Sequence, residues 1–350
     1  FVHETLVKME KLNPRMITLA RESRQMVLAD LGEKMGLSAQ SIRNMEQSQQ
    51  NIKQATLDTL SNALGYPVSF FFQQGENVPL PFSYRKRGTV PFQLLDAIDA
   101  QVNIFRLNLE KLITATGFSV QSLPVLDVTK LGSPADCAKQ LRKQWNLKPG
   151  PINDLAELLE NHNILLASYD FGTDEVDSKC TIAADEFPMI VTNKTLLGDR
   201  QRFTLAYQLG FLVMHWKTFP DFERKLEREA KEFASAFLMP EEEIKEELTD
   251  LKFSQLPGLK TKWKASMISL VHRSDDLGVI DENRKNNIIK QFGVHGIKFR
   301  EPKEYDVQVE KYKLIRDLIT KYKKAQKLNV KQMAEFFCLN EEDFLKRYNF

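Results

Sequence analysis

Four short blocks of apolar residues at helical spacing, within residues 16–72, set the strongest limit on how this chain can fold. Polar residues or glycine separate the blocks, and a fifth short helix is expected near Pro67. Between the second and third blocks, Gly36 permits a tight turn and Ser38 is suited to cap the next helix. The segment therefore predicts a bundle of short helices that contains a helix-turn-helix.

This segment, from "LARESR" to "ALGYPVSFFF", resembles the helix-turn-helix domain of the XRE (Cro/repressor) family. In that family the third helix enters the major groove of DNA, where Gln can pair with adenine and Arg with guanine. The resemblance implies a double-stranded DNA operator as the partner. It implies that the residues facing DNA are Ser38, Gln40, Ser41, Arg43 and Asn44.

The charge of the segment is low for a DNA-binding domain. Residues 15–73 carry six Lys and Arg against five Asp and Glu, and the whole chain has a formal net charge of +2. Because affinity for DNA comes largely from phosphate contacts, the basic run "YRKR" at residues 84–87 is a candidate to supplement them. A helical bundle used only for protein contacts remains the alternative.

A longer helix is predicted after this segment, over residues 94–114. Its apolar residues repeat at spacings of four and three, as in a coiled-coil seam, and include Val102 and Phe105. The seam can pair across a dimer axis or pack on the next domain. A helix-turn-helix that reads two half-sites needs a dimer, so we expect a homodimer.

Residues 134–250 alternate between helical and β-rich patterns. "PADCAKQLRKQWNL" and "INDLAELLENHN" predict helices, and "ILLASYDF", "KCTIAAD" and "PMIVTN" predict short strands. Two more helices follow, in "RQRFTLAYQLGFLVMH" and "EREAKEFASAFLMP". This order predicts a mixed α+β domain within a chain that is otherwise mainly helical.

These segments resemble the ImmA/IrrE metallopeptidase family, in particular members fused to an N-terminal XRE domain. The resemblance rests on Asn193, the run at residues 200–203, Leu209-Gly210, His215 and the run at residues 233–240. It implies a zincin-like domain. The downstream "LKTKWKASMISLVHRSDDLGVI" resembles the helical C-terminal extension usual in that family.

The metal chemistry of that family is missing from this chain. The resemblance places the two histidine ligands at Tyr207 and Phe211, the catalytic glutamate at Gln208 and the third ligand at Glu229. Phe has no lone pair, neutral Tyr is a poor zinc ligand and Gln is a very weak base. We therefore expect no catalytic residue, no metal and no cofactor, and we expect these four positions to lie at a cleft for a peptide, protein or small-molecule ligand.

Other residues could in principle rebuild a metal site. His215 lies four residues after Phe211, and His162, Asp185 and Asp199 precede the helix, but no pair of them has a recognised ligand spacing. A His on an apolar helix is more often a hydrogen-bonded core residue, and Glu229 can pair with an Arg or with Tyr207.

Composition limits the compartment in which the protein works. Cys137, Cys180 and Cys338 lie far apart, which suits buried thiols in a reducing compartment. No apolar run reaches the roughly 20 residues that span a bilayer, and no signal-peptide pattern is visible. We expect a cytoplasmic protein without membrane contact, with a natural start at Met9 or Met16.

These expectations give four regions. They are a DNA-binding domain at 9–75, a linker with an amphipathic helix at 76–130, an ImmA/IrrE-like domain at 131–250 and a helical extension at 251–350. The extension ends in a helix beginning Glu341-Glu342-Asp343, which would repel phosphate and predicts a packing or oligomerisation unit.

The sequence predicts a sequence-specific transcriptional regulator with a catalytically inactive peptidase-like sensor domain. The resemblance suggests a repressor of a mobile-element, phage, defence or antitoxin-type locus. The alternative is a metallopeptidase with a rearranged metal site that cleaves a partner repressor.

Overall fold

The computed structural model describes residues 11–47, 52–75, 84–119, 122–182, 187–217 and 225–348. The chain divides into two compact units. Unit 1 consists of residues 1–81, 88–119 and 315–350, and unit 2 consists of residues 82–87 and 120–314. Met9 and Asp185, which figured in the sequence analysis, lie outside the described residues.

The first part of unit 1 is the expected bundle of short helices. Its elements are α1 (Pro14–Ser23), α2 (Leu28–Met35), α3 (Ala39–Gln47), α4 (Gln54–Leu64) and the 3-10 helix η1 (Val68–Phe72). Gly36 ends α2 in the left-handed conformation, with φ of 64°. A Cβ on Gly32 would lie 2.6 Å from the Leu37 carbonyl oxygen, so this glycine lets the turn pack closely on α2.

Helix α5 (Phe92–Thr116) confirms the helix expected over residues 94–114. Its apolar seam, however, is buried inside the chain, because Val102 and Phe105 are both 0% exposed. The Phe105 ring packs edge-on against Tyr348, with 5.7 Å between ring centroids, and the Arg347 guanidinium lies over it at 4.7 Å. The seam is therefore not available for pairing across a dimer axis.

The C-terminal tail folds onto the N-terminal bundle within unit 1. Its helices are α15 (Leu314–Gln326), α16 (Val330–Phe336) and α17 (Glu341–Tyr348). Asp343 accepts a hydrogen bond at 2.6 Å from Arg24, which directly follows α1, and the Asn340 amide donates to the Gly65 carbonyl after α4. The acidic start of α17 is thus used for packing.

This grouping differs from the expected boundaries. Helix α5 was expected in a linker region and residues 251–350 in one extension, whereas the structure joins α5 and residues 315–350 to the N-terminal bundle. Gln101 of α5 shows why, since it donates to the Ser23 carbonyl and accepts from Arg347 of the tail.

Unit 2 contains one four-stranded mixed sheet in the order β1-β3-β4-β2. The strands are β1 (Tyr84–Lys86), β2 (Leu165–Tyr169), β3 (Val176–Ile182) and β4 (Pro188–Asn193). Strands β2 and β4 are parallel, and the other two pairs are antiparallel. The strands β2 to β4 were expected, whereas β1 was not.

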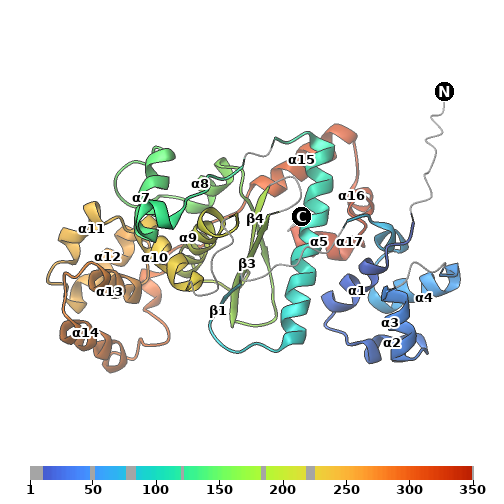
Figure 1. The fold of residues 1–350 in the computed structure, drawn as a ribbon, viewed down its shortest axis with the longest axis horizontal. Coiled ribbons are helices and arrows are strands. Elements are labelled where there is room, and N and C mark those ends of the chain that lie inside the picture. Colours follow the sequence, from blue (N-terminus) through green and yellow to red (C-terminus); the bar gives the residue numbers. More distant parts are fainter. Residues whose placement is uncertain are drawn as a thin grey trace. The chain divides into compact units, whose positions relative to one another are not determined.

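The helices of unit 2 lie to one side of this sheet, on the left in Figure 1. They are α6 (Val128–Leu131), α7 (Pro134–Gln144), α8 (Leu155–Asn161), α9 (Gly198–Met214), α10 (Leu226–Leu238), α11 (Glu241–Leu248), α12 (Leu256–Trp263), α13 (Met267–Asp276) and α14 (Glu282–Val294), with 3-10 turns η2 (Phe253–Gln255) and η3 (Lys303–Tyr305). Helix α9 lies on the sheet and is buried along nearly its whole length. The mainly helical fold with a central α+β part agrees with expectation. In the described part of the chain, no helix has the length and apolar character needed to cross a bilayer.

We predict that Gly210→Ala will destabilise unit 2. A Cβ at Gly210 would lie 2.6 Å from Cδ1 and 2.8 Å from Cγ of Phe233 in α10, so the two helices could no longer pack closely. The free energy of unfolding of the full chain, measured by urea titration, should fall by about 1–3 kcal/mol.

Gly258→Ala is the matched control, because nothing lies within 4 Å of a Cβ added there in α12. Alanine should leave stability unchanged or raise it by up to about 1 kcal/mol. Equal stability of both variants would show that α9 and α10 do not meet at Gly210.

Candidate functional site

Helix α3 presents a polar face to solvent in unit 1. Ile42 is its only buried residue, and Gln40, Arg43 and Asn44 are exposed. The Gln40 amide donates to the Asn44 side-chain oxygen at 2.9 Å, so these two side chains lie together one turn apart. The face therefore offers an amide pair and a guanidinium, which are groups that can read base edges in a major groove.

Of the two serines assigned to this face, Ser38 caps the helix and Ser41 lies in its first turn. The Ser38 hydroxyl accepts from the Ser41 backbone N–H at 3.1 Å and lies 2.9 Å from the Ser41 hydroxyl. A capping hydroxyl is already engaged by the helix N-terminus. Ser38 and Ser41 are therefore placed to fix the start of α3, while Gln40, Arg43 and Asn44 point to solvent.

An ion pair that the sequence analysis missed holds α3 in place. Arg21 of α1 donates from Nε to Glu46 Oε1 at 2.6 Å and from a second nitrogen to Oε2 at 3.1 Å. Arg21 also donates to the Met26 carbonyl at 2.8 Å, in the turn before α2. A bidentate, largely buried pair of this kind fixes orientation, so it positions the exposed face of α3 relative to α1.

In unit 2, the three positions on α9 that the resemblance assigns to two metal ligands and a catalytic glutamate are deeply buried. Tyr207 is 2% exposed, Gln208 is 0% and Phe211 is 5%. The Gln208 amide nitrogen donates to the Ser178 hydroxyl of β3 at 2.7 Å, which ties the helix to the sheet. The residue in the place of a catalytic base therefore acts as a hydrogen-bond donor between two elements of the core.

Tyr207 is covered by a cation. The Arg85 guanidinium of β1 lies 5.8 Å from the centre of the Tyr207 ring and 4.9 Å from that of Phe203. Burial raises the pKa of the Tyr207 phenol, with the nearby Arg85 opposing the rise, so the phenol is neutral at physiological pH. A neutral phenol is a poor ligand for zinc.

The remaining former ligand position faces a histidine. Glu229 of α10 lies 3.3 Å from Nε2 of His215, and the His215 ring meets Phe211 edge-on at 5.6 Å between centroids. An Arg or Tyr207 was expected as the partner of Glu229, and the contact found is with His215. His215 is buried in the core, as the sequence analysis expected for a His on an apolar helix.

This set of donors does not fit a zinc ion. Phe211 offers no lone pair and the Gln208 amide is engaged by Ser178. His162 stacks on Trp145 and contacts the Leu158 carbonyl, while Asp199 pairs with Lys260. Within the described ranges, no three His, Cys, Asp or Glu side chains are grouped as metal ligands would be.

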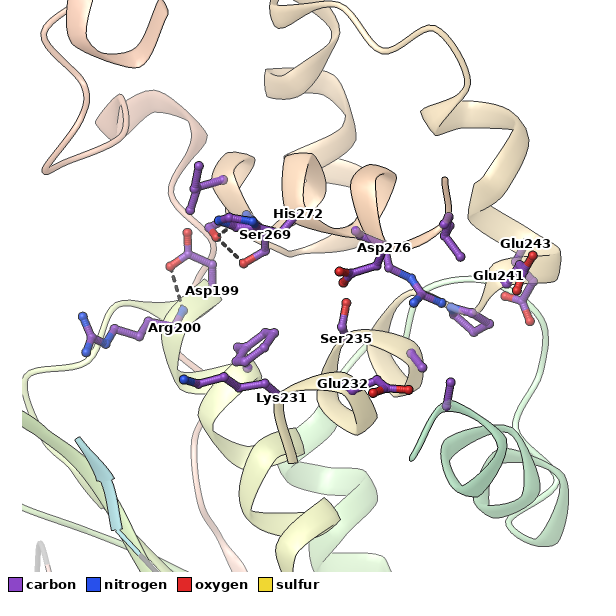
Figure 2. A pocket seen from close by; sticks show the side chains of 18 of the residues that line it. Asp199, Arg200, Lys231, Glu232, Ser235, Glu241, Glu243, Ser269, His272 and Asp276 are labelled. Carbon is purple, nitrogen blue, oxygen red and sulfur yellow. Dashed lines mark hydrogen bonds between the residues drawn. The ribbon is translucent and has the colours of Figure 1, made fainter. Parts of the chain in front are cut away.

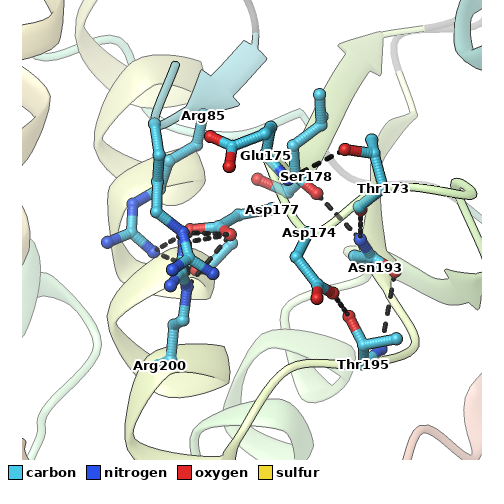
Figure 3. A network of polar contacts seen from close by, with 12 residues as sticks. Arg85, Thr173, Asp174, Glu175, Asp177, Ser178, Asn193, Thr195 and Arg200 are labelled. Carbon is cyan, nitrogen blue, oxygen red and sulfur yellow. Dashed lines mark hydrogen bonds and ion pairs between the residues drawn. The ribbon is translucent and has the colours of Figure 1, made fainter. Parts of the chain in front are cut away.

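A buried carboxylate collects three guanidinium groups beside α9 (Figure 3). Asp177 of β3 is 1% exposed, and its oxygens lie 3.0 Å from Arg85, 2.5 Å from Arg200 and 3.9 Å from Arg87. Burial raises the pKa of Asp177 to about 6, with Arg85 and Arg87 opposing the shift, so the carboxylate is ionised at neutral pH. The cluster joins β1, β3 and the first turn of α9.

The cluster corrects one expectation about DNA binding. The basic run at residues 84–87 was expected to add phosphate contacts. Instead, Arg85 and Arg87 face Asp177, and Lys179 lies 3.5 Å from the centre of the Tyr84 ring. Strand β1 is a part of unit 2, and its Arg85 faces a buried charge there, with Arg87 directly after the strand.

A cleft of about 1650 Å³ opens next to this cluster. Figure 2 shows Lys231, Glu232 and Ser235 of α10 on one side and Ser269, His272 and Asp276 of α13 on the other. Among its lining residues, Lys and Arg outnumber Asp and Glu. Tyr207, Gln208, Phe211 and Glu229 do not line it, so the open space lies beside the former metal positions and not over them.

Comparison with family models agrees with both parts of this description. Residues 17–71 match the model described as Helix-turn-helix, and residues 159–275 match the model described as IrrE N-terminal-like domain. No curated protein and no solved structure matched the chain. The chain thus carries an XRE-type helix-turn-helix followed by a peptidase-like domain, and the first of these identifies a DNA-binding regulator.

We predict that Asp177→Asn will lower the free energy of unfolding by about 2–4 kcal/mol, because it leaves Arg85 and Arg200 without their buried counter-charge. Chemical denaturation of the full chain provides the measurement. The control is Asp174→Asn, whose side chain is exposed and accepts one hydrogen bond, from the Thr195 hydroxyl at 2.8 Å. Its cost should stay below about 1 kcal/mol, and an equal loss in both variants would contradict the central role of Asp177.

Proposed function

We propose that this protein is a sequence-specific repressor whose peptidase-like domain has lost its metal chemistry and serves as a sensor. It binds an operator in double-stranded DNA through α3. The family resemblance suggests that the controlled locus belongs to a mobile element, a phage, a defence system or an antitoxin-type operon.

The observation that supports DNA reading best is the exposed face of α3. Gln40, Arg43 and Asn44 lie on this face, and the Arg21–Glu46 pair holds the helix that carries them. Side chains of these types make bidentate contacts with adenine and guanine. Ser38 and Ser41 start the helix and lie close to where the DNA backbone would pass, since helix N-termini favour phosphate.

The loss of catalysis is supported by what has replaced the metal site. Tyr207 lies under Arg85, Gln208 donates to Ser178 and Phe211 packs on His215. Each substitution provides a contact that does not need a metal. A domain with such contacts can stay folded without an ion. A sensor without metal chemistry needs this property, whereas a metallopeptidase keeps its ion and does not.

The cleft between α10 and α13 is the proposed effector site. Its volume of about 1650 Å³ exceeds what a small ligand needs, so a peptide or a segment of another protein fits it better. Its excess of basic side chains favours an effector with acidic groups.

The repressor is proposed to act as a homodimer. Reading two half-sites of a palindromic operator requires two copies of α3 at a fixed spacing. Because Val102 and Phe105 are buried in the chain, the dimer contact must use a surface other than the apolar seam of α5.

The proposed role of the exposed α3 face in reading DNA can be tested by operator binding. We expect Gln40→Ala and Arg43→Ala each to weaken binding to a palindromic duplex from the protein's own promoter by about 1–3 kcal/mol, because each removes a base contact. Arg316→Ala is the control, since Arg316 is also exposed but lies in α15. Fluorescence anisotropy at fixed salt gives the affinities, and unchanged binding in both α3 variants would show that another element reads the DNA.

The absence of metal chemistry can be tested directly. Elemental analysis of the purified protein should find no stoichiometric metal, and chelators should change neither thermal stability nor operator binding. The triple variant Tyr207→His, Gln208→Glu and Phe211→His should gain zinc affinity, because residues 207 and 211 share a helix face and Glu229 lies beside it near His215. Stoichiometric metal in the unaltered protein would reject the sensor proposal in favour of a rearranged peptidase site.

A further inference from the structure

The two helices on either side of the cleft present polar faces with the same spacing. Four side chains of each helix line the cleft: Arg228, Lys231, Glu232 and Ser235 of α10, and Ser269, His272, Arg273 and Asp276 of α13. Both sets follow the pattern i, i+3, i+4 and i+7, so each set forms one face of its helix. The face that a helix turns towards its own domain is usually apolar. Two polar faces on opposite sides of a cleft therefore indicate a surface for a polar ligand.

The charges on these faces are separated along the cleft (Figure 2). Arg200 and Lys231 lie at one end, which we call the basic end, and Arg228 lies one turn before Lys231 on α10. Glu232 and Asp276 face each other farther along the cleft, at what we call the acidic end. Lys231 and Glu232 are neighbours in the sequence, but their side chains point in opposite directions along the cleft. The cleft therefore has an electrical polarity.

A buried hydroxyl opens into the cleft beside the acidic end. Ser235 is 7% exposed, and Figure 2 shows its side chain turned towards α13. Within the described residues, no hydrogen bond to the Ser235 hydroxyl is formed. Because a buried polar group costs free energy until it is bonded, this hydroxyl is suited to bond a ligand.

The two carboxylates of the acidic end lack a close cation. Neither Glu232 nor Asp276 forms an ion pair in the part of the chain that the structure describes. Burial raises the pKa of Glu232, with Arg228 opposing the rise and Asp276 adding to it. Burial also raises the pKa of Asp276, with Arg273 opposing the rise. A cationic group placed between the two carboxylates would therefore stabilise both in their charged form.

We propose that the cleft binds an extended peptide of mixed charge, with an acidic residue at the basic end and a basic residue at the acidic end. The proposal rests on the effector site proposed above and deepens it, because it adds a cation and a fixed order of charges to the ligand. Arg228 and Ser235 are seven residues apart on α10, which corresponds to about 10 Å. An extended peptide covers that length in about three residues, so about three positions separate its two charges.

The experiment compares peptides that have one composition and different orders of charge. The probes are the acetylated and amidated hexapeptides Glu-Glu-Ala-Ala-Lys-Lys, its reverse, and Glu-Lys-Ala-Ala-Lys-Glu, in which the charges are symmetric. Each is titrated into the full chain by isothermal titration calorimetry without DNA. The better of the two polar peptides should bind at least about fivefold more tightly than the symmetric peptide, because only a polar peptide places each charge against its opposite.

Variants of the chain test the two ends of the cleft. Replacing both carboxylates, Glu232→Gln with Asp276→Asn, should bring the polar and symmetric peptides to within about twofold of each other, since the lysines lose their partners. Lys231→Gln should also reduce the preference, because it removes a cation from the basic end. Glu246→Gln is the matched control and should keep the preference, since Glu246 is exposed in α11 and does not line the cleft.

Equal affinity of the unaltered chain for the polar and symmetric peptides would overturn the proposal, as would a preference that survives both the carboxylate variant and Lys231→Gln. Thermal unfolding of each variant shows whether it is folded. If the carboxylate variant does not fold, Lys231→Gln decides, because this side chain is exposed and its loss leaves the core intact.

A fourth peptide, Glu-Glu-Ala-Ala-Glu-Glu, separates this proposal from the effector site on which it rests. If the acidic peptide binds at least as tightly as the polar ones, the mixed charge is rejected and an acidic effector stands. If none of the four peptides binds, both are rejected. Operator binding and metal content are measured without any peptide, so either outcome leaves the proposed repressor function to its own tests.

Discussion

The burial of α9 is the constraint on which the rest of unit 2 depends. Every polar side chain on a helix inside the protein must find a partner there, or it costs free energy. Gln201 meets this requirement by exchanging two hydrogen bonds with the backbone of Glu310, and Arg202 by pairing with the Glu310 carboxylate and donating to the Ile152 carbonyl. Gln208 does so through Ser178.

The same constraint accounts for the side chains found at positions 207, 208 and 211. A glutamate at position 208, or histidines at 207 and 211, would be buried charged or polar groups. Without an ion to pair with, they would lower the stability of the core. Gln208 keeps the length of glutamate but is neutral and donates to Ser178, while Tyr207 and Phe211 fill the space with rings. The three side chains are thus consistent with the proposed loss of a metal site, because none of them carries a charge that would need an ion.

Sequence patterns predicted the parts of the fold that depend on local spacing. The short helices of unit 1, the turn at Gly36, helix α5 and strands β2 to β4 all follow from periodicity and turn residues. The exposed positions of Gln40, Arg43 and Asn44 follow from the same pattern, since Ile42 alone faces the core.

What the sequence could not show are contacts between residues far apart in the chain. Arg85 meets Asp177 and Arg24 meets Asp343, and no local pattern links either pair. The seam of α5 illustrates the same limit, since periodicity identifies an apolar face but not the Tyr348 ring that covers it. The cleft beside α9 is likewise formed by elements separated by many residues, so its position could not be read from the helix that carries the motif.

These long-range ion pairs also change how the DNA-binding unit must obtain its affinity. Several cations of residues 15–73 are engaged inside the protein, because Arg21 pairs with Glu46 and Arg24 with Asp343. The run at residues 84–87 is used in unit 2. Exposed cations in the bundle include Lys34, Arg43 and Lys53, and Arg43 lies on the reading face. With few charges left for phosphates, the proposed operator binding would rely on base contacts, on helix N-termini and on two copies of α3 binding together, so the proposed dimer would be a point at which binding is controlled.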